Sequence, residues 1–292
     1  MLAEVSLECN SNYTRMSFRG AAKLVLPPAV ANRIRVASYR WSLRRFQPYQ
    51  VRRSRAGHQF DLWISDPTAK NWYDRDSSEV PPEMSFLANH RLRPGSTVFD
   101  CGAFQCLIAM LLAKFVGPTG KVVAVEASPH NYQAAIRNCR ANNAANVEVI
   151  NAAVSDSADP LEFNCRANGQ VDDGSGAWGK IAVPSVSVDE LTRRFGPPGV
   201  LFVDVEGFES KVLLGAADTL SRHRPDCFLE MHVGCGLEKF GGSVKSITDS
   251  LAKLGYQFWM ASPELDTFIP FSESSPIVRQ RFFLIATTAA AS

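Results

Sequence analysis

The sequence predicts an α/β protein whose strands form a mostly parallel, doubly wound sheet. Short apolar runs, typical of buried strands, alternate with segments of helical periodicity from residue 97 onward. A glycine turn follows the first of these runs at Asp100-Cys101-Gly102, and an acidic residue, Glu126, ends the second. Strands and helices that alternate in this way favour a Rossmann-like sheet covered by helices.

Each predicted element follows from a local pattern. Ser128 can cap a helix that begins near Pro129, and glycine and proline mark the turn at 117–120. The predicted order is strand 97–100, helix 104–116, strand 121–126, helix 129–142, strand 147–152, a strand pair at 161–163 and 181–183, helix 188–195, strand 200–205, helix 208–222, strand 227–232, helix 243–254, and strands 256–260 and 281–287.

The glycine turn indicates a cofactor that contains a nucleoside. Gly102 lets the backbone approach a ligand closely, and Glu126 can accept hydrogen bonds from both hydroxyls of a ribose. The G-x-G-x-x-G pattern of pyrophosphate binding is absent, since Ala103 and Phe104 follow Gly102. Asp100 would repel a phosphate but suits the cationic amino-acid end of S-adenosylmethionine. The turn therefore favours a methyl donor, although similar turns occur in domains that bind no nucleotide.

A second motif, Leu-Phe-Val-Asp-Val-Glu-Gly at 201–207, is followed by Gly215-Ala216. With residues 98–103, 125–129, 151–156, 188–191 and 228–232, it resembles the FkbM family of S-adenosylmethionine-dependent methyltransferases across residues 80–288. The resemblance implies a class I methyltransferase fold. On these motifs, the predicted cofactor-binding residues are Asp100, Gly102, Ala103, Glu126, Ala127, Ala153 and Asp204.

Two parts of the sequence depart from the family pattern. The family usually has D-x-G-A-N-x-G in the first motif, where this chain carries Phe104 and Cys106. The strand before the second motif usually bears a lysine, and this chain has Phe202 there. The larger side chains at 104 and 106 can narrow the methionine pocket, which leaves the strength of cofactor binding open.

Catalytic residues are expected where parallel strands end, because ligands of doubly wound sheets bind there. Asp204, Glu206, Glu230 and His232 lie at such ends. We predict that Asp204 positions or deprotonates the acceptor, and that Glu206 shares the proton or helps to hold a divalent cation. His232, on one strand face with Glu230, is a candidate general base. The alternatives are helix capping for Glu206 and for the nearby Glu209, and a hydrogen-bonded core position for His232.

The predicted function is methylation of a hydroxyl on a sugar, a glycolipid or a small polar metabolite. Trp178, in a glycine-rich loop, can stack on a sugar or on adenine, and the resemblance places Tyr73 and Glu83 near the same cleft. A nucleic-acid substrate is disfavoured, because no Asn/Asp-Pro-Pro-Tyr motif follows strand 200–205 and the net charge is only +2. The alternative is a catalytically silent module that docks through its arginine-rich N-terminal segment.

The first 95 residues differ in kind, so we predict a basic helical extension and cap at 1–95 and a methyltransferase domain at 96–292. A helix at 29–46 and the arginines from Arg33 to Arg55 suit either an anionic membrane surface or, as we favour, a solvated cap. No apolar run reaches the roughly 18 residues of a membrane span, and no signal peptide is seen, so we expect a cytoplasmic protein. Seven cysteines without a C-x-x-C pair predict reduced thiols and no zinc site.

Overall fold

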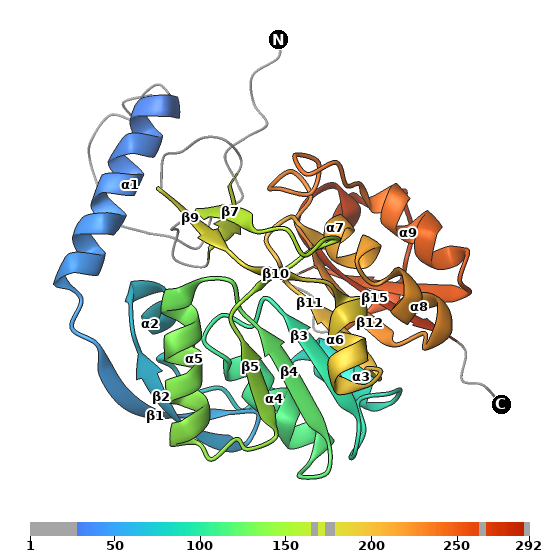
Figure 1. The fold of residues 1–292 in the computed structure, drawn as a ribbon, viewed down its shortest axis with the longest axis horizontal. Helices are drawn as coiled ribbons and strands as arrows, with labels where there is room; N and C mark the ends of the chain where they lie inside the picture. The colour runs from blue at the N-terminus through green and yellow to red at the C-terminus, as the bar shows by residue number, and fades with distance from the viewer. Residues whose placement is uncertain (1–27, 165–168, 173–178, 263–266, 289–292) are drawn as a thin grey trace.

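The computed structural model describes residues 28–164, 169–172, 179–262 and 267–288. Within these ranges an eight-stranded sheet forms the centre of the molecule (Figure 1). Its order is β14 (Ile269–Pro270), β13 (Tyr256–Ala261), β15 (Phe282–Thr288), β12 (Asp226–Met231), β11 (Val200–Val203), β3 (Thr97–Cys101), β4 (Lys121–Val125) and β5 (Val147–Ile150). The strands from β12 to β5 run parallel, and β15, β13 and β14 join antiparallel. The predicted mostly parallel α/β sheet is therefore confirmed.

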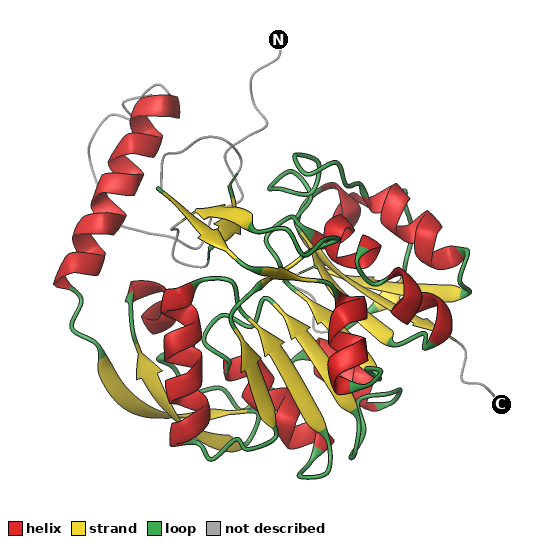
Figure 2. Ribbon diagram, in the orientation of Figure 1, coloured by secondary structure: helices red, strands yellow, loops and turns green. Residues whose placement is uncertain are grey.

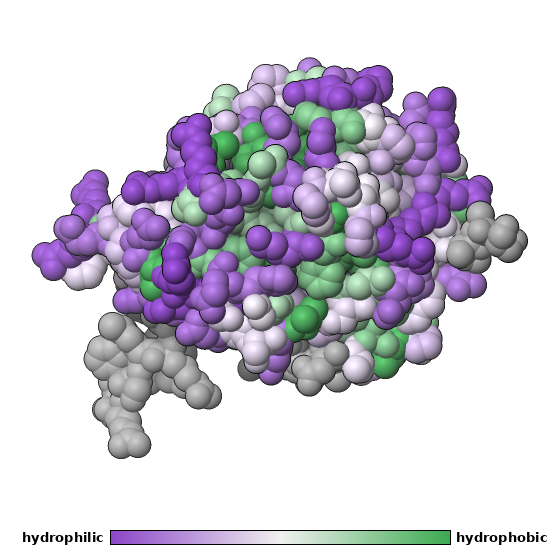
Figure 3. All heavy atoms as spheres, turned by 90° about the horizontal axis from the view of Figure 1, so that it is seen from below, coloured by the Kyte–Doolittle hydropathy of each residue, from purple (hydrophilic) through white to green (hydrophobic). Residues whose placement is uncertain are grey.

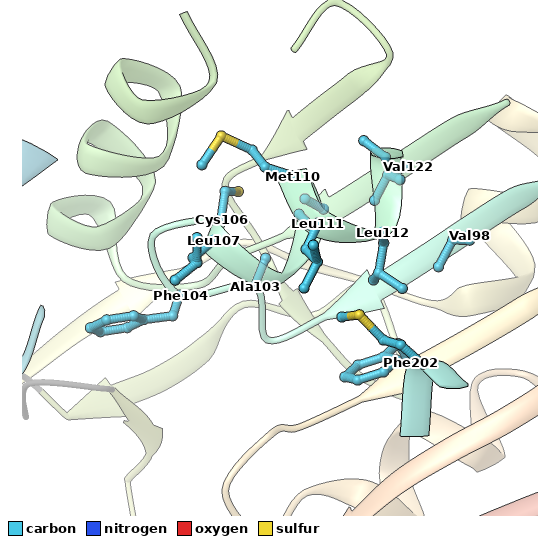
Figure 4. Close-up of a cluster of buried hydrophobic side chains, with 14 of the residues drawn as sticks. Val98, Ala103, Phe104, Cys106, Leu107, Met110, Leu111, Leu112, Val122 and Phe202 are labelled. Carbon is cyan, nitrogen blue, oxygen red and sulfur yellow. The ribbon is translucent and has the colours of Figure 1, made fainter. Parts of the chain in front are cut away.

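Helices cover both faces of this sheet, because side chains that alternate along each strand point to opposite sides (Figure 2). Val98 and Phe202 pack on one face with α4 (Leu107–Val116) and α5 (Pro129–Ala141), a cluster drawn in part in Figure 4. Phe99 and Leu201 pack on the other. The helices there are α6 (Val188–Phe195), α7 (Glu209–Leu214), α8 (Ala217–Arg222) and α9 (Val244–Ala252).

Two predicted helix boundaries differ from the structure. The helix predicted at 104–116 begins only at Leu107, because Phe104 and Cys106 adopt positive φ values of 48° and 66°. The helix predicted at 208–222 is split into α7 and α8 at Gly215. A Cβ atom on Gly215 would lie 2.1 Å from the carbonyl oxygen of Ser155, so the chain bends where a glycine packs against the neighbouring backbone.

Short strands form two smaller sheets at the carboxyl edge of the main one. β7 (Leu161–Asn164) pairs with β8 (Gln170–Val171) and β9 (Lys180–Val183), which confirms the predicted strand pair. β6 (Ala153–Val154) pairs in parallel with β10 (Ser185–Val186). These strands carry the chain across the edge where the predicted site residues lie.

The N-terminal region contains a hairpin that the sequence did not predict. β1 (Tyr49–Arg55) and β2 (His58–Ile64) pair antiparallel between α1 (Pro28–Arg45) and α2 (Pro67–Tyr73), and α3 (Pro82–Ala88) follows. The backbone amides of Asp61 and Trp63 donate to the side chains of Asn142 and Asn138 of α5 at 2.8 and 2.6 Å. The buried face of β2 joins the same core as α4 and α5. A description of residues 1–95 as helical is therefore incomplete.

Several arginines of the predicted basic segment are engaged within the chain. Arg52 forms an ion pair with Asp61, Arg53 pairs with Asp74, and Arg55 donates to carbonyl oxygens at the end of α2. None of the described helices is both long and apolar enough to cross a membrane. In Figure 3 hydrophilic side chains predominate on the face shown, with hydrophobic residues in small groups between them. For the remaining arginines, a solvated cap stays the prediction and contact with an anionic surface stays the alternative.

The cysteines differ in part from the prediction of reduced thiols. Cys101, Cys106, Cys139 and Cys227 are buried and free. Cys235 is disulfide-bonded, so the prediction was wrong for this residue. Its type alone, with no paired motif nearby, gave no signal of bonding.

Candidate active site

The first motif folds into a tight turn, residues 100–106, which we call the cofactor turn. Gly102 has φ +95°, and a Cβ atom there would lie 1.8 Å from the carbonyl oxygen of Asp204. Only glycine therefore lets the ends of β3 and β11 approach this closely. Phe104 and Cys106 follow in left-handed conformations, and their side chains point in different directions (Figure 4).

Glu126 links the cofactor turn to the loop after β4. Its carboxylate accepts hydrogen bonds from the backbone amides of Phe104 at 2.9 Å and Ser128 at 2.7 Å. The side chain is buried, and burial raises the pKa of Glu126 to about 8 against the opposing effect of these two amides. The carboxylate is thus held in one place by backbone donors on either side.

An open cavity lies beside this turn. Trp72, Phe104 and Phe208 contribute aromatic surface to its wall. Asp100 and Ala103 are buried and do not line the cavity, and burial raises the pKa of Asp100 to about 7. Cys106 does not line it either. The predicted cofactor residues that do are Gly102, Glu126, Ala127, Ala153 and Asp204.

Four predicted catalytic residues meet at the carboxyl ends of β11 and β12. We call Asp204, Glu206, Glu230 and His232 the strand-end cluster. The Nε2 atom of His232 lies 3.7 Å from Asp204 Oδ1, 3.7 Å from Glu206 Oε2 and 3.8 Å from Glu230 Oε1. These separations exceed hydrogen-bond length. Asp204 and Glu206 also line the cavity, so the cluster adjoins the predicted cofactor site.

Two further residues complete the cluster. Glu209, fully buried on α7, lies with its Oε1 atom 2.6 Å from His232 Nδ1 and accepts a hydrogen bond from the amide of Gly207. Arg281, just before β15, forms an ion pair with Glu230. The sequence indicated Glu209 only as a helix cap, and it gave no signal for Arg281, whose position depends on how β15 joins the sheet.

The charges of the cluster change how its members titrate. Burial opposes a proton on His232, but the hydrogen bond to Glu209 and the carboxylates of Glu206 and Glu230 outweigh it and raise the pKa to about 10. Burial, together with the nearby Glu230, raises the pKa of Asp204 well above its usual value. Without another ligand, His232 therefore holds its proton at neutral pH.

The predicted acceptor-binding residues are placed differently from one another. Tyr73 is buried and packs edge-on against Phe104, with ring centroids 5.6 Å apart, whereas the neighbouring Trp72 lines the cavity. Glu83 is half-buried at the start of α3, and burial together with Glu230 raises its pKa to about 7. Glu83 is thus close enough to the cluster for the charge of Glu230 to raise its pKa. Trp178 lies outside the described residues.

Comparison with known proteins identifies the family of this chain. A family model described as the methyltransferase FkbM domain matches residues 100–258, which is more than half of the chain. The chain therefore belongs to the FkbM family of S-adenosylmethionine-dependent methyltransferases. Family membership confirms the resemblance, the class I fold and S-adenosylmethionine as the cofactor. A search of curated proteins found no match.

Solved structures with a similar fold are distant in sequence. A methyltransferase FkbM from Methylobacillus flagellatus is 16% identical, with 65% of this chain and 43% of that chain covered and a TM-score of 0.45. Aeropyrum pernix fibrillarin with bound S-adenosylmethionine is 13% identical, with 84% and 86% covered and a TM-score of 0.43. An O-methyltransferase from Bacillus cereus is 13% identical, with 72% and 82% covered and a TM-score of 0.43. This chain thus spans less than half the length of the first of these proteins.

Proposed function

We propose that this methyltransferase acts on a hydroxyl group of a sugar, a glycolipid or another small polar acceptor. The supporting observation is that Asp204 and Glu206 belong both to the wall of the cofactor cavity and to the strand-end cluster. Groups able to take or share a proton therefore stand beside the place where the cofactor is expected. A hydroxyl is a poor nucleophile at neutral pH and benefits from such groups.

The residues around the cavity fit the cofactor. Gly102 lets the ends of β3 and β11 approach closely beside the cavity, and Glu126 presents a fixed carboxylate suited to the ribose hydroxyls. Ala127, Ala153 and the aromatic wall give apolar surface suited to adenine. When bound, S-adenosylmethionine supplies an electrophilic methyl group on a sulfonium.

Asp204 is the best candidate for the group that receives the acceptor proton. Its raised pKa makes the carboxylate a stronger base than an ordinary aspartate. His232, a candidate general base, already carries a proton at neutral pH because its pKa is about 10. We therefore assign His232 a role in holding the carboxylates of the cluster and Asp204 the proton transfer, with Glu206 beside it.

A small acceptor is favoured over a nucleic acid by the charges near the site. Carboxylates of Glu83, Asp204, Glu206 and Glu230 gather here, and they would repel a phosphate backbone. Carboxylates are, in contrast, good hydrogen-bond acceptors for the hydroxyls of a sugar.

The test is methyl transfer from labelled S-adenosylmethionine to a panel of sugars, glycolipids and polar metabolites. We expect label on an acceptor oxygen, identified by mass spectrometry and NMR. S-adenosylhomocysteine binding, followed by calorimetry, shows in parallel that the cofactor site is intact. Transfer only to nitrogen or to RNA by a protein that binds this ligand would contradict the proposal.

A further inference from the structure

Three buried polar atoms face one another in the strand-end cluster. Asp204 Oδ1 and His232 Nε2 each lack a hydrogen-bond partner within the described part of the chain, whereas Glu230 Oε1 is paired with Arg281. The three atoms lie within 4.8 Å of one another. Glu230 and His232 are only 6% and 2% exposed, so water does not compensate freely. We propose that these three atoms bind one divalent cation, an inference that rests on the proposed role of the cluster in holding the acceptor.

The spacing of the three atoms suits a shared ion. His232 Nε2 lies 3.7 Å from Asp204 Oδ1 and 3.8 Å from Glu230 Oε1, too far for hydrogen bonds between them. Two ligand atoms that bind the same small divalent ion at about 2.1 Å lie about 3.0 to 3.4 Å apart. A small inward shift of the side chains therefore brings all three into coordination distance.

The orientation of His232 is that of a metal ligand. Its Nδ1 atom lies 2.6 Å from Glu209 Oε1, and Glu209 is itself fixed by the amide of Gly207. Histidines that bind metals almost always donate their other ring N–H to a carboxylate or carbonyl, which fixes the ring and raises the basicity of the ligand nitrogen. This contact leaves Nε2 to face Asp204 and Glu230. A cation would replace the proton at this nitrogen.

The surrounding charge favours a cation as well. Asp204, Glu206, Glu209 and Glu230 bring four carboxylates together around His232, and Arg281, which pairs with Glu230, also acts electrostatically on Asp204 and Glu206. A carboxylate has two oxygens and about four lone-pair positions, so Glu230 can bind both the guanidinium and an ion.

The ligand types indicate a divalent ion of the first transition series. Two carboxylate oxygens suit Mg²⁺ or Mn²⁺, and one imidazole nitrogen shifts the preference toward transition metals. Asp204 Oδ1 is buried although the Asp204 side chain is 39% exposed, which leaves Oδ2 on the open side. An ion held by Oδ1 would thus bind the acceptor hydroxyl and make its proton easier to remove, while Oδ2 receives that proton.

The experiment titrates the whole chain, purified with chelator and then freed of it, with Mn²⁺. Electron paramagnetic resonance follows the loss of the free-ion signal, with and without S-adenosylhomocysteine. We expect one Mn²⁺ per chain, with affinity reduced by at least about tenfold in Asp204→Asn and in His232→Gln. The control Asp249→Asn, which removes an exposed carboxylate on α9, should bind as the unaltered protein does.

A second measurement needs no variant of the cluster and covers the case in which His232→Gln fails to fold. Electron spin echo modulation on bound Mn²⁺ should show coupling to an imidazole nitrogen, and His130→Gln should keep this coupling. No stoichiometric binding, or binding without nitrogen coupling, would overturn the inference. So would equal Mn²⁺ affinity in the unaltered protein and in a folded Asp204→Asn protein.

The two proposals fail in different ways. Mn²⁺ binding at the cluster without methyl transfer to any hydroxyl would remove the proposed function but keep the site. Methyl transfer that continues undiminished in excess chelator, in a protein that binds no Mn²⁺, would remove the cation site and keep the methyltransferase function.

Discussion

The cofactor turn and the strand-end cluster adjoin one cavity, but the chain satisfies the hydrogen-bonding groups of these two regions to different degrees. In the cofactor turn, both oxygens of Glu126 accept backbone hydrogen bonds, and the Asn151 amide donates to the carbonyls of Glu126 and Ala127 at 2.8 and 3.0 Å. In the cluster, the buried atoms Asp204 Oδ1 and His232 Nε2 have no hydrogen-bond partner among the described residues. The fold therefore preorganises the cofactor turn, whereas the strand-end cluster keeps polar atoms available to a bound ligand.

The largest expected effect tests the cluster. Asp204→Asn keeps the shape of the side chain but removes the charge that receives the acceptor proton, so turnover should fall by about 10² to 10⁴-fold. Cofactor affinity should change far less, because the cofactor turn does not depend on this charge. Labelled methyl transfer and calorimetry with S-adenosylhomocysteine measure the two quantities. Full activity in this variant would mean that the acidic motif only supports α7, and that the acceptor is activated from elsewhere.

The next effect tests the cofactor turn. Glu126→Ala removes a charged acceptor for the ribose hydroxyls and should weaken S-adenosylmethionine binding by roughly 2 to 3 kcal/mol. Because Glu126 also accepts from Phe104 and Ser128, part of this loss comes from a looser turn. Glu126→Gln keeps one acceptor oxygen and should lose less. An unchanged dissociation constant in Glu126→Ala would show that this residue does not hold the cofactor.

A smaller effect concerns the cost of burying Glu126. Its pKa of about 8 lies above the value of about 4.3 in an unfolded chain, so the charged form disfavours the fold. The contribution of Glu126 to the free energy of unfolding is therefore fully present below a pH of about 4.3, and it falls as the pH rises toward 8. Between pH 6 and 8.5 the free energy of unfolding of the unaltered protein should fall by about 2 kcal/mol more than that of the Glu126→Gln protein. Urea unfolding at both pH values measures this, and equal losses would contradict it.

How far the sequence predicted each region has a physical explanation. Gly102, Asp204 and His232 could be placed because strand ends and glycine turns leave local patterns. Arg281 could not, since its pairing with Glu230 depends on the antiparallel strand β15, which closes the sheet from far along the chain. The hairpin β1–β2 was missed because arginines on β1 obscured the alternation of a strand.

The backbone of the cofactor turn was hidden for a related reason. Helical periodicity through Phe104 and Cys106 predicted a helix that began too early, whereas both residues are left-handed. The family pattern has Asn and Gly at these two positions, the residue types that adopt this conformation most readily. The departure from the pattern therefore concerns backbone strain as well as the width of the pocket.

The smallest effect separates strain from ligand contact. Cys106→Gly removes the backbone strain of a left-handed non-glycine residue, which should raise the free energy of unfolding by about 1 kcal/mol. The same change removes a buried side chain from the core, which should lower the free energy of unfolding by a similar amount. Stability should change by less than about 1 kcal/mol, and cofactor affinity should hold, because Cys106 does not line the cavity. Phe104→Asn is the contrasting variant, because Phe104 lines the cavity and its ring centroid lies 4.9 Å from that of Trp72. Both the stability and the cofactor affinity should therefore change in this variant. Urea unfolding and calorimetry with S-adenosylhomocysteine compare the two. A large loss of affinity in Cys106→Gly would show that the thiol contacts the ligand and that the turn moves when the cofactor binds.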